Sequence, residues 1–275
     1  MKSPAARVSD DALRRFGRLL RAWYRINARD LPWRRTRDPY AILVSELMLQ
    51  QTQVSRVEPR WHQFLAQFPT LHTIATASIT DVEEAWEGLG YYARARNLRR
   101  TARLVTRDGA DASATLPGDA VSLRTLPGIG RYTAGAVASF AYGQRTPLVD
   151  TNVARVLQRV FLPRAKRKVA ATENALWELA ERSLPGTSPA VWTHNQALME
   201  IGALVCTARV MRCGECPVRR VCATYAAASV KPRSTTSTRA RAVAIAVQSS
   251  APVSQATSRT MRRFRKGDTP THVNE

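Results

Sequence analysis

The four cysteines of the chain lie within 17 residues, and its 275 residues contain no others. They follow the pattern C-x6-C-x2-C-x5-C, at Cys206, Cys213, Cys216 and Cys222. Four thiolates on so short a segment can close around one metal centre, and sulfur-only ligation suits an iron–sulfur cluster or zinc. Structural zinc sites usually carry two C-x2-C-type pairs, whereas this segment has one. Two disulfides are the third interpretation, but such pairing is typical of small secreted domains.

The composition favours a polyanionic partner. Lys and Arg together number 42 against 21 Asp and Glu, which gives a formal net charge of +21. Residues 1–230 alone hold 33 basic and 19 acidic side chains. Such an excess is typical of proteins that bind nucleic acid. No segment reaches the length of a membrane span, and the N-terminal residues contain no apolar signal core. We therefore expect a cytoplasmic protein with no signal peptide and no membrane partner.

The spacing of apolar residues predicts helices over residues 10–225. Leu13, Phe16 and Leu20 recur at steps of three and four residues, and no segment shows the sustained alternation of a strand. Glycine and proline turn signals separate the expected helices. The composition then shifts toward Ser, Thr, Ala and Arg, which predicts a basic, disordered tail over residues 229–275.

A glycine turn lies between two short helical patterns in residues 120–141. It reads LPGIG, from Leu126 through Gly128 to Gly130, and Arg131 begins the second pattern. Glycines let the backbone approach a phosphate closely, and the amides at the N-terminus of the next helix point at that anion. These residues predict a helix-hairpin-helix, which would hold the DNA backbone without reading bases.

Two carboxylates occur in contexts that would drive their pKa values apart. Glu46 lies in a helical run beside Val44, Leu47 and Met48, so burial would raise its pKa and keep it protonated as a general acid. The alternative is that Glu46 lies on a solvated helix edge. Asp150 directly precedes a helical pattern, where an N-cap role is compatible with an ionised carboxylate. An anion fixed there could stabilise a developing positive charge.

The motifs together resemble those of the helix-hairpin-helix DNA glycosylases related to endonuclease III and MutY. SELMLQQT at residues 45–52 is nearly identical to a MutY signature, and GLGYYARARNL at residues 88–98 also favours that branch. LPGIG followed by RYTAGA resembles the family's hairpin closely. The cysteine spacing matches the family's cluster loop, which implies a 4Fe-4S cluster as the cofactor. The resemblance covers roughly residues 10–228.

The resemblance also implies roles for individual side chains. Glu46 would protonate the base and Asp150 would support the sugar cation, with Tyr132 and Asn152 completing the catalytic group. Arg34 and Leu49 match residues that line the family's adenine pocket. The family inserts side chains into DNA or contacts it at positions that correspond to Gln51, Thr52, Tyr91 and Tyr92, in addition to the hairpin residues Leu126, Gly128, Gly130 and Arg131.

Position 132 separates two mechanistic classes of this family. Bifunctional members carry a lysine there, which attacks the sugar and forms a Schiff base, whereas the phenol of Tyr132 cannot form an imine. We therefore expect a monofunctional enzyme that uses water. Asp150, Thr151 and Asn152 read DTN where MutY proteins commonly read DGN. A related branch that removes mismatched thymine carries a similar tyrosine and aspartate, so excision at G·T or G·U is an alternative.

These observations predict an all-α, two-lobe helix-hairpin-helix DNA glycosylase fold with an iron–sulfur cluster loop. Residues 36–145 would form a helical bundle with the hairpin, and residues 1–35 with 146–228 would form the cluster lobe. We expect a monomer acting on double-stranded DNA of the bacterial nucleoid, at adenine mispaired with 8-oxoguanine or guanine. Only 53 residues follow Cys222, so we do not expect the MutT-like domain of MutY proteins. A non-catalytic iron–sulfur protein that binds DNA or senses redox state is the rival interpretation, but it would not need both carboxylates.

Overall fold

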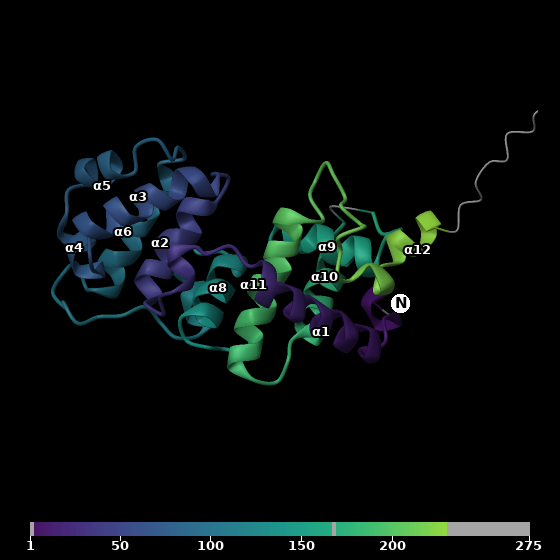
Figure 1. Cartoon of the computed structure of the whole chain (residues 1–275). Coiled ribbons are helices and arrows are strands. Elements are labelled where there is room, and N and C mark those ends of the chain that lie inside the picture. The colour runs from purple at the N-terminus through teal and green to yellow at the C-terminus, as the bar shows by residue number, and fades with distance from the viewer. Residues whose placement is uncertain (1–2, 167–168, 230–275) are drawn as a thin grey trace, which may run out of the picture. The chain divides into compact units, whose positions relative to one another are not determined.

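The fold was analysed in a computed structural model, which describes residues 3–166 and 169–229 (Figure 1). Within these residues the regular structure is helical, apart from one isolated β-bridge between Cys206 and Met211. The all-α prediction is confirmed. Apart from Ser229, the predicted basic tail lies outside the described residues. The elements are η1 (Pro4–Arg7), α1 (Asp10–Asn27), η2 (Pro32–Arg34), α2 (Pro39–Leu49), α3 (Val54–Gln67), α4 (Leu71–Thr76), α5 (Ile79–Ala85), α6 (Ala93–Val105), α7 (Ala120–Leu123), α8 (Arg131–Phe140), α9 (Thr151–Phe161), α10 (Ala170–Ser183), α11 (Ser188–Leu204), η3 (Arg219–Val221) and α12 (Ala223–Ser229).

Helix α1 shows how the sequence pattern becomes a packed helix. Its N-cap, Ser9, accepts a hydrogen bond from the Ala12 backbone N at 3.3 Å, which satisfies one of the free amides of the first turn. Leu13, Phe16 and Leu20 fall on one face and are buried, while arginines occupy the opposite face. The helix can therefore cover a core and still present positive charge to solvent.

Helix α2 has no polar face. Asp38 caps it by accepting from the Tyr40 backbone N at 2.9 Å, and Pro39 supplies the fixed backbone torsion of the first turn. Nine of its eleven residues are buried, including Glu46. A helix that is apolar on all sides is surrounded by protein. The position of Glu46 within it is therefore set by the packing of its neighbours.

Two groups of buried apolar side chains form the core. The first gathers residues of α2 to α8, with Phe64 and Trp86 fully buried. The second gathers residues of α1, α9, α10 and α11, with Phe16 and Leu20 fully buried. Figure 1 shows α3 to α6 on one side and α9, α10 and α12 on the other, with α8 and α11 between them. Two core groups are compatible with the two predicted lobes, residues 36–145 and residues 1–35 with 146–228. The boundaries of these lobes stay a prediction.

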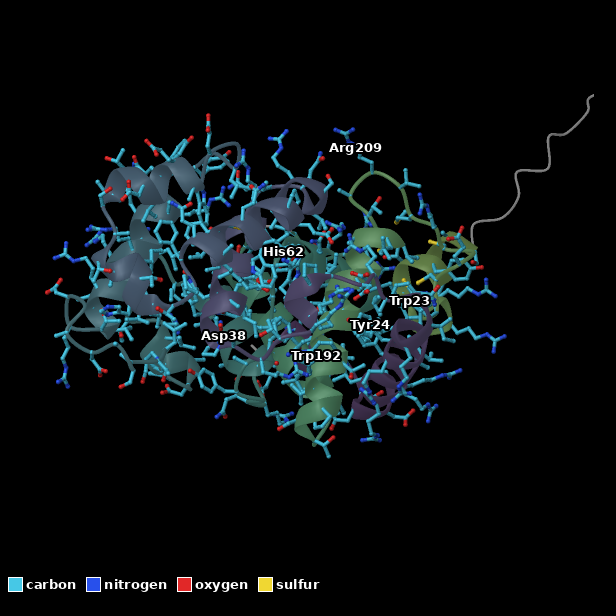
Figure 2. All side chains as sticks on the ribbon, turned by 60° about the vertical axis from the view of Figure 1, so that its left-hand side comes forward. Trp23, Tyr24, Asp38, His62, Trp192 and Arg209 are labelled. Carbon is cyan, nitrogen blue, oxygen red and sulfur yellow. The ribbon has the colours of Figure 1, made fainter. Side chains whose placement is uncertain are left out.

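Trp192 of α11 joins the two groups, since it packs against both. Its ring meets Tyr24 on one side and Phe140 on the other, each edge-on with centroids 6.4 Å apart. The Arg37 guanidinium lies over the same ring at 4.8 Å. Figure 2 shows Trp192 beside Tyr24. Within this part, no helix combines the length and apolarity needed to span a membrane.

Candidate active site and cysteine cavity

The carboxyl group of Glu46 is buried at the centre of the candidate active site, where Glu46 is only 6% exposed. Burial raises the pKa of Glu46 to about 7; a hydrogen bond from Tyr132 opposes this rise and the charge of Asp150 adds to it. The side chain can therefore hold a proton at neutral pH and release it to a stronger base. The alternative prediction, that Glu46 lies on a solvated edge of its helix, is wrong because the side chain is buried.

Asp150 is held in place as the N-cap of α9. Its Oδ1 accepts from the Val153 backbone N at 2.6 Å, and its Oδ2 accepts from Asn152 Nδ2 at 2.9 Å. Short bonds of this kind and the positive end of α9 stabilise a carboxylate. The first turn of α9 thus presents a fixed negative charge within electrostatic range of Glu46.

Tyr132 of α8 lies within electrostatic range of both carboxyl groups. Burial raises the pKa of its phenol well above 10, and the charges of Glu46 and Asp150 raise it further. The Tyr132 hydroxyl lies 3.2 Å from Met199 Sδ, and it also forms a hydrogen bond with the Glu46 side chain. The structure therefore brings together one acid, one anion and one neutral phenol from α2, α9 and α8.

Arg34 contributes positive charge to the same region. Its Nη2 donates to Glu200 Oε2 at 2.7 Å and its Nε donates to Gln196 Oε1 at 2.9 Å. Glu200 also accepts from Arg29 at 2.8 Å. Burial alone would raise the pKa of Glu200, but the hydrogen bonds from Arg29 and Arg34 outweigh it and lower that pKa to about 2. Glu200 is thus a buried anion that fixes the Arg34 guanidinium.

Asn152 links the candidate active site to the cysteine segment. Its Oδ1 accepts from Arg155 Nη2 at 2.7 Å, and the same nitrogen donates to the Gly202 backbone O at 2.7 Å. Arg155 Nε donates to the Cys206 backbone O at 2.9 Å. A Cβ on Gly202 would come within 2.8 Å of Asn152 Cβ, so glycine permits this contact between α11 and α9.

The predicted DNA-inserting residues lie in two turns. Gln51 follows the end of α2, and Tyr91 precedes α6; both side chains are exposed. Thr52 Oγ1 donates to the Leu89 backbone O at 3.3 Å, which joins the two turns. Tyr92 is 37% exposed, whereas Leu49 is half-buried against the first core group.

The hairpin prediction corresponds to α7, the turn through Gly128 and Gly130, and α8. Gly128 has φ +75°, and a Cβ there would meet Asn97 at 2.7 Å, so the turn requires glycine. A Cβ on Gly130 would meet nothing within 4 Å, so the space beside the N-cap of α8 is open. Leu126 is half-buried, and the Arg131 guanidinium lies over the Trp177 ring at 3.7 Å.

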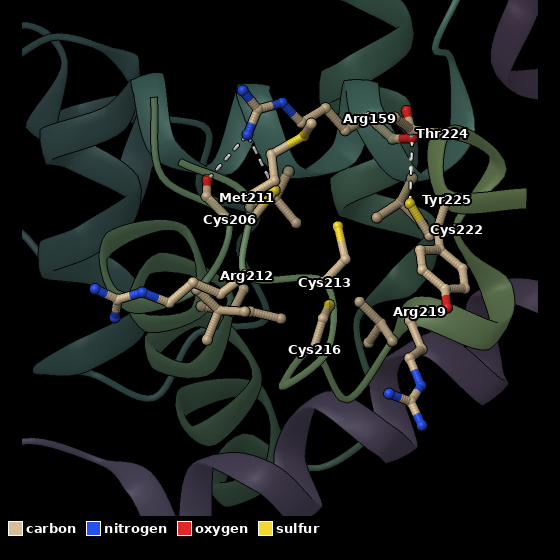
Figure 3. A pocket seen from close by; sticks show the side chains of 15 residues that line it. Arg159, Cys206, Met211, Arg212, Cys213, Cys216, Arg219, Cys222, Thr224 and Tyr225 are labelled. Atoms are coloured by element: carbon tan, nitrogen blue, oxygen red, sulfur yellow. Dashed lines mark hydrogen bonds between the residues drawn. The ribbon is translucent and has the colours of Figure 1, made fainter. Parts of the chain in front are cut away.

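All four cysteines line one cavity (Figure 3). Apolar side chains of α9 and α11 form much of its wall, and three arginines stand around it: Arg159, Arg212 and Arg219. Arg159 Nη1 lies 3.3 Å from Cys206 Sγ. Burial raises the pKa of Cys216 to about 11. Within the described residues, no three His, Cys, Asp or Glu side chains meet closely enough to bind one metal ion.

Several residues of this region were not predicted from the sequence: Glu200, Gln196, Arg155 and Arg94. The signal for Glu200 was the same as for Glu46, a single carboxylate inside an apolar helix, but no motif drew attention to it. Arg155 lies one helical turn beyond Asn152, so its side chain can reach back to it. Arg94 of α6 donates to the backbone O of Gln50 at 2.7 Å and of Gly90 at 2.9 Å, and no local pattern reveals contacts to two separate turns.

Comparison with known proteins now places the chain in a family. Residues 44–182 match the family model of the HhH-GPD superfamily base excision DNA repair proteins. The chain therefore belongs to this superfamily, and the helix-hairpin-helix fold expected from the sequence is confirmed.

Adenine DNA glycosylases are among the most similar curated relatives. The chain is 44% identical to the one from Homo sapiens over 212 residues, which cover 74% of this chain and 38% of that protein. It is 47% identical to the one from Mycobacterium tuberculosis H37Rv over 204 residues, or 72% of this chain and 64% of that protein. The chain thus spans less than two thirds of either relative.

Two solved structures share the fold. A thermostable thymine-DNA glycosylase superimposes with a TM-score of 0.71 at 29% identity, over 79% of this chain and 98% of that one. An endonuclease III–DNA covalent intermediate gives a TM-score of 0.64 at 22% identity, over 81% of this chain and 99% of that one.

Proposed function

We propose that the chain is a monofunctional DNA glycosylase that removes adenine mispaired with 8-oxoguanine or guanine in double-stranded DNA. The observation that carries the proposal is the burial of Glu46, which raises its pKa to about 7, in the same site as Asp150 with its two hydrogen bonds. A buried acid and a fixed anion are the two groups that cleavage of a purine N-glycosidic bond requires. The identity to adenine DNA glycosylases supports the choice of base.

The proposed reaction begins with adenine outside the helical stack. Glu46 donates its proton to a ring nitrogen of adenine, and the bond from the sugar C1′ to the base breaks with its electron pair going to the base. Asp150 stabilises the resulting sugar cation. Water then adds to C1′ and transfers a proton to the solvent, which leaves an abasic sugar. Arg34, Leu49, Tyr132 and Asn152 would shape the pocket and orient the two carboxyl groups.

The proposed enzyme is monofunctional because no amine is available where a Schiff base would form. Position 132 holds tyrosine, and the sequence contains no lysine between residues 3 and 165, the segment that includes Glu46, Tyr132 and Asp150. An imine requires an amine nucleophile on the protein. Water therefore remains as the nucleophile.

DNA contacts are proposed at the hairpin and the two exposed turns. The N-terminus of α8, with open space beside Gly130, suits a backbone phosphate, and the exposed side chains of Gln51 and Tyr91 could fill the space that the extruded base leaves. We propose that a monomer makes these contacts with its two lobes. The cytoplasmic location expected from the sequence remains a proposal.

We also propose that Cys206, Cys213, Cys216 and Cys222 hold a 4Fe-4S cluster. Each cysteine of such a cluster binds a different iron, so the four thiols need not meet at one point. The cavity suits this group, because its donors are all sulfur and nearby arginines offset the negative charge of the cluster. Bound there, the cluster would tie the segment that contains Cys213, Cys216 and Cys222 to Cys206, which follows α11.

Single-turnover base release from a panel of duplexes tests the proposed function. The panel contains A·8-oxoG, A·G, G·T, G·U and undamaged pairs, with the Glu46→Gln variant as the matched control. We expect adenine release from the first two duplexes and none by the variant. Thymine or uracil release without adenine release would establish the alternative favoured by the superposition with a thymine-DNA glycosylase. Binding to these duplexes with no release of any base would instead support the non-catalytic interpretation.

A further inference from the structure

The two exposed turns share an unusual backbone. Gln51 has φ 58° and Tyr91 has φ 48°, so both lie in the left-handed region that side chains other than glycine rarely adopt. Tyr91 is also 62% exposed. Such conformations persist where surrounding contacts enforce them. Both side chains are exposed, so contacts to the backbone of the two turns are the main source of constraint to consider.

One guanidinium, that of Arg94, contacts the backbone of both turns. At the end of α2 its Nη1 donates to the backbone O of Leu47 at 2.5 Å, of Met48 at 2.9 Å and of Gln50 at 2.7 Å. Its Nη2 donates to the backbone O of Leu89 at 3.0 Å and of Gly90 at 2.9 Å.

Two of these acceptors have a particular position. The carbonyls of Gln50 and Gly90 belong to the peptide bonds that immediately precede Gln51 and Tyr91. Fixing those peptide planes restricts the φ torsions of both left-handed residues. A single side chain therefore constrains the two strained positions at once.

The side chain of Arg94 is buried between two aromatic rings. Arg94 is 8% exposed, and its guanidinium lies over the rings of Trp86 and Tyr91 at 5.6 and 5.5 Å. The planar guanidinium offers five donors in a fixed geometry, whereas the lysine ammonium offers three on one atom. Lysine at this position would retain the charge but could not reach both sets of carbonyls.

We propose that Arg94 is a positioning residue that holds both turns in the conformation in which they enter DNA together. This inference rests on the proposed function, because it assumes that Gln51 and Tyr91 insert when the target base leaves the stack. Arg94 itself touches neither base nor sugar. Its effect is to order the two turns before binding, so that DNA does not have to order them.

The first test uses Arg94→Lys, with Arg99→Lys as the matched control on the same helix. Arg99 is half-buried and its Nε donates to the Ala77 backbone O at 2.8 Å, away from both turns. Hydrogen exchange of the DNA-free protein should accelerate at residues 50–52 and 90–92 in Arg94→Lys alone. Unchanged exchange in either turn would overturn the proposal, and this measurement does not depend on any enzymatic activity.

The second test measures base extrusion in a duplex that carries 2-aminopurine opposite guanine. The fluorescence of 2-aminopurine rises when this base leaves the stack. Arg94→Lys should slow extrusion about tenfold, within the range expected for residues of one network, while affinity for undamaged duplex stays unchanged. In a background with Gln51→Ala and Tyr91→Ala the effect of Arg94→Lys should largely disappear. Additive effects would show that Arg94 stabilises the fold only, and would overturn the proposal. Absence of extrusion by the unsubstituted protein would count against the proposed function instead.

A third test leaves Arg94 in place, in case its variant does not fold. Valine strongly disfavours positive φ, so Gln51→Val should disturb the first turn, and Tyr91→Val the second. If Arg94 couples the turns, each substitution should accelerate hydrogen exchange in the other turn. Independent behaviour of the two turns would refute the coupling.

Discussion

The side-chain amide of Asn152 bridges Asp150 and Arg155. Its Nδ2 donates to Asp150 Oδ2 at 2.9 Å, and its Oδ1 accepts from Arg155 Nη2 at 2.7 Å. Arg155 in turn donates to the backbone of Gly202 and Cys206. The orientation of the proposed catalytic anion is therefore fixed by a side chain that also contacts the cysteine segment. A change at the cysteines could reach Asp150 through these bonds.

Asn152→Ala should lower single-turnover base release by roughly 10- to 100-fold, as the loss of an orienting partner often does at a catalytic or metal site. The carboxylate of Asp150 would lose one of its two hydrogen bonds and rotate more freely. Binding of mispaired duplex should stay near the unsubstituted level. Thr151→Ala is the control, since Thr151 is adjacent and exposed. Equal rates for the two variants would show that the bond to Asp150 has no catalytic role.

Base release should decline as pH rises through about 7, because only protonated Glu46 can donate a proton. Tyr132→Phe removes a hydrogen bond that lowers the pKa of Glu46, so it should shift this decline to higher pH. Single-turnover rates measured between pH 5 and 9 test both statements. A decline at the same pH in the variant would mean that another group controls the rate.

Glu46→Gln should abolish base release and stabilise the protein at alkaline pH. The folded pKa of Glu46, about 7, exceeds its usual 4.5, so its favourable contribution is complete below pH 4.5 and lost as pH rises through 7. The variant should therefore match the unsubstituted protein near pH 4 and exceed it by up to about 3 kcal/mol at pH 8. Urea unfolding at both pH values measures the difference.

The titration of Glu46 should also mask an opposite effect of His194 on the pH dependence of stability. Burial lowers the pKa of His194 to about 3, so its contribution is complete above pH 6.5 and is lost as pH falls toward 3. Between pH 5 and 6.5 the two effects cancel, and stability should change little. In Glu46→Gln the stability should rise with pH by about 1.4 kcal/mol per unit over this interval. A flat profile in the variant would show that His194 does not titrate as described.

The protein should not cut the DNA strand. With no lysine between residues 3 and 165, borohydride should trap little or no covalent protein–DNA complex, and strand breaks should appear only after treatment with alkali. A bifunctional endonuclease III-like enzyme serves as the positive control. Efficient trapping would show that an amine outside this segment acts as the nucleophile.

Anaerobically purified protein should contain iron and acid-labile sulfide at about four of each per chain, as expected for one cluster held by four cysteines. Cys213→Ala should lower both contents, because Cys213 lines the cavity with the other three thiols. Colourless, active protein with one zinc per chain would refute the cluster.

The sequence by itself determined the helical class and the helix-hairpin-helix fold, and it predicts the cysteine loop and the two catalytic carboxylates. These are local features: apolar periodicity, a glycine turn, and residues within one short motif. The positive φ of Gly128 could be inferred from the LPGIG turn alone, because glycine adopts this torsion without strain. The monofunctional chemistry proposed for this chain likewise depends on a local feature, because the side chain at position 132 ends in a hydroxyl and not in an amine.

Tertiary structure alone decided how these features act on one another. The pKa of Glu46 depends on burial by distant segments and on the charge of Asp150, which is 104 positions away in the sequence. Arg34 is fixed by Glu200 and Gln196 of α11, and Arg94 joins carbonyls from two turns. Desolvation and hydrogen bonding are set by distances in space between residues far apart in the chain, so no local pattern could supply them.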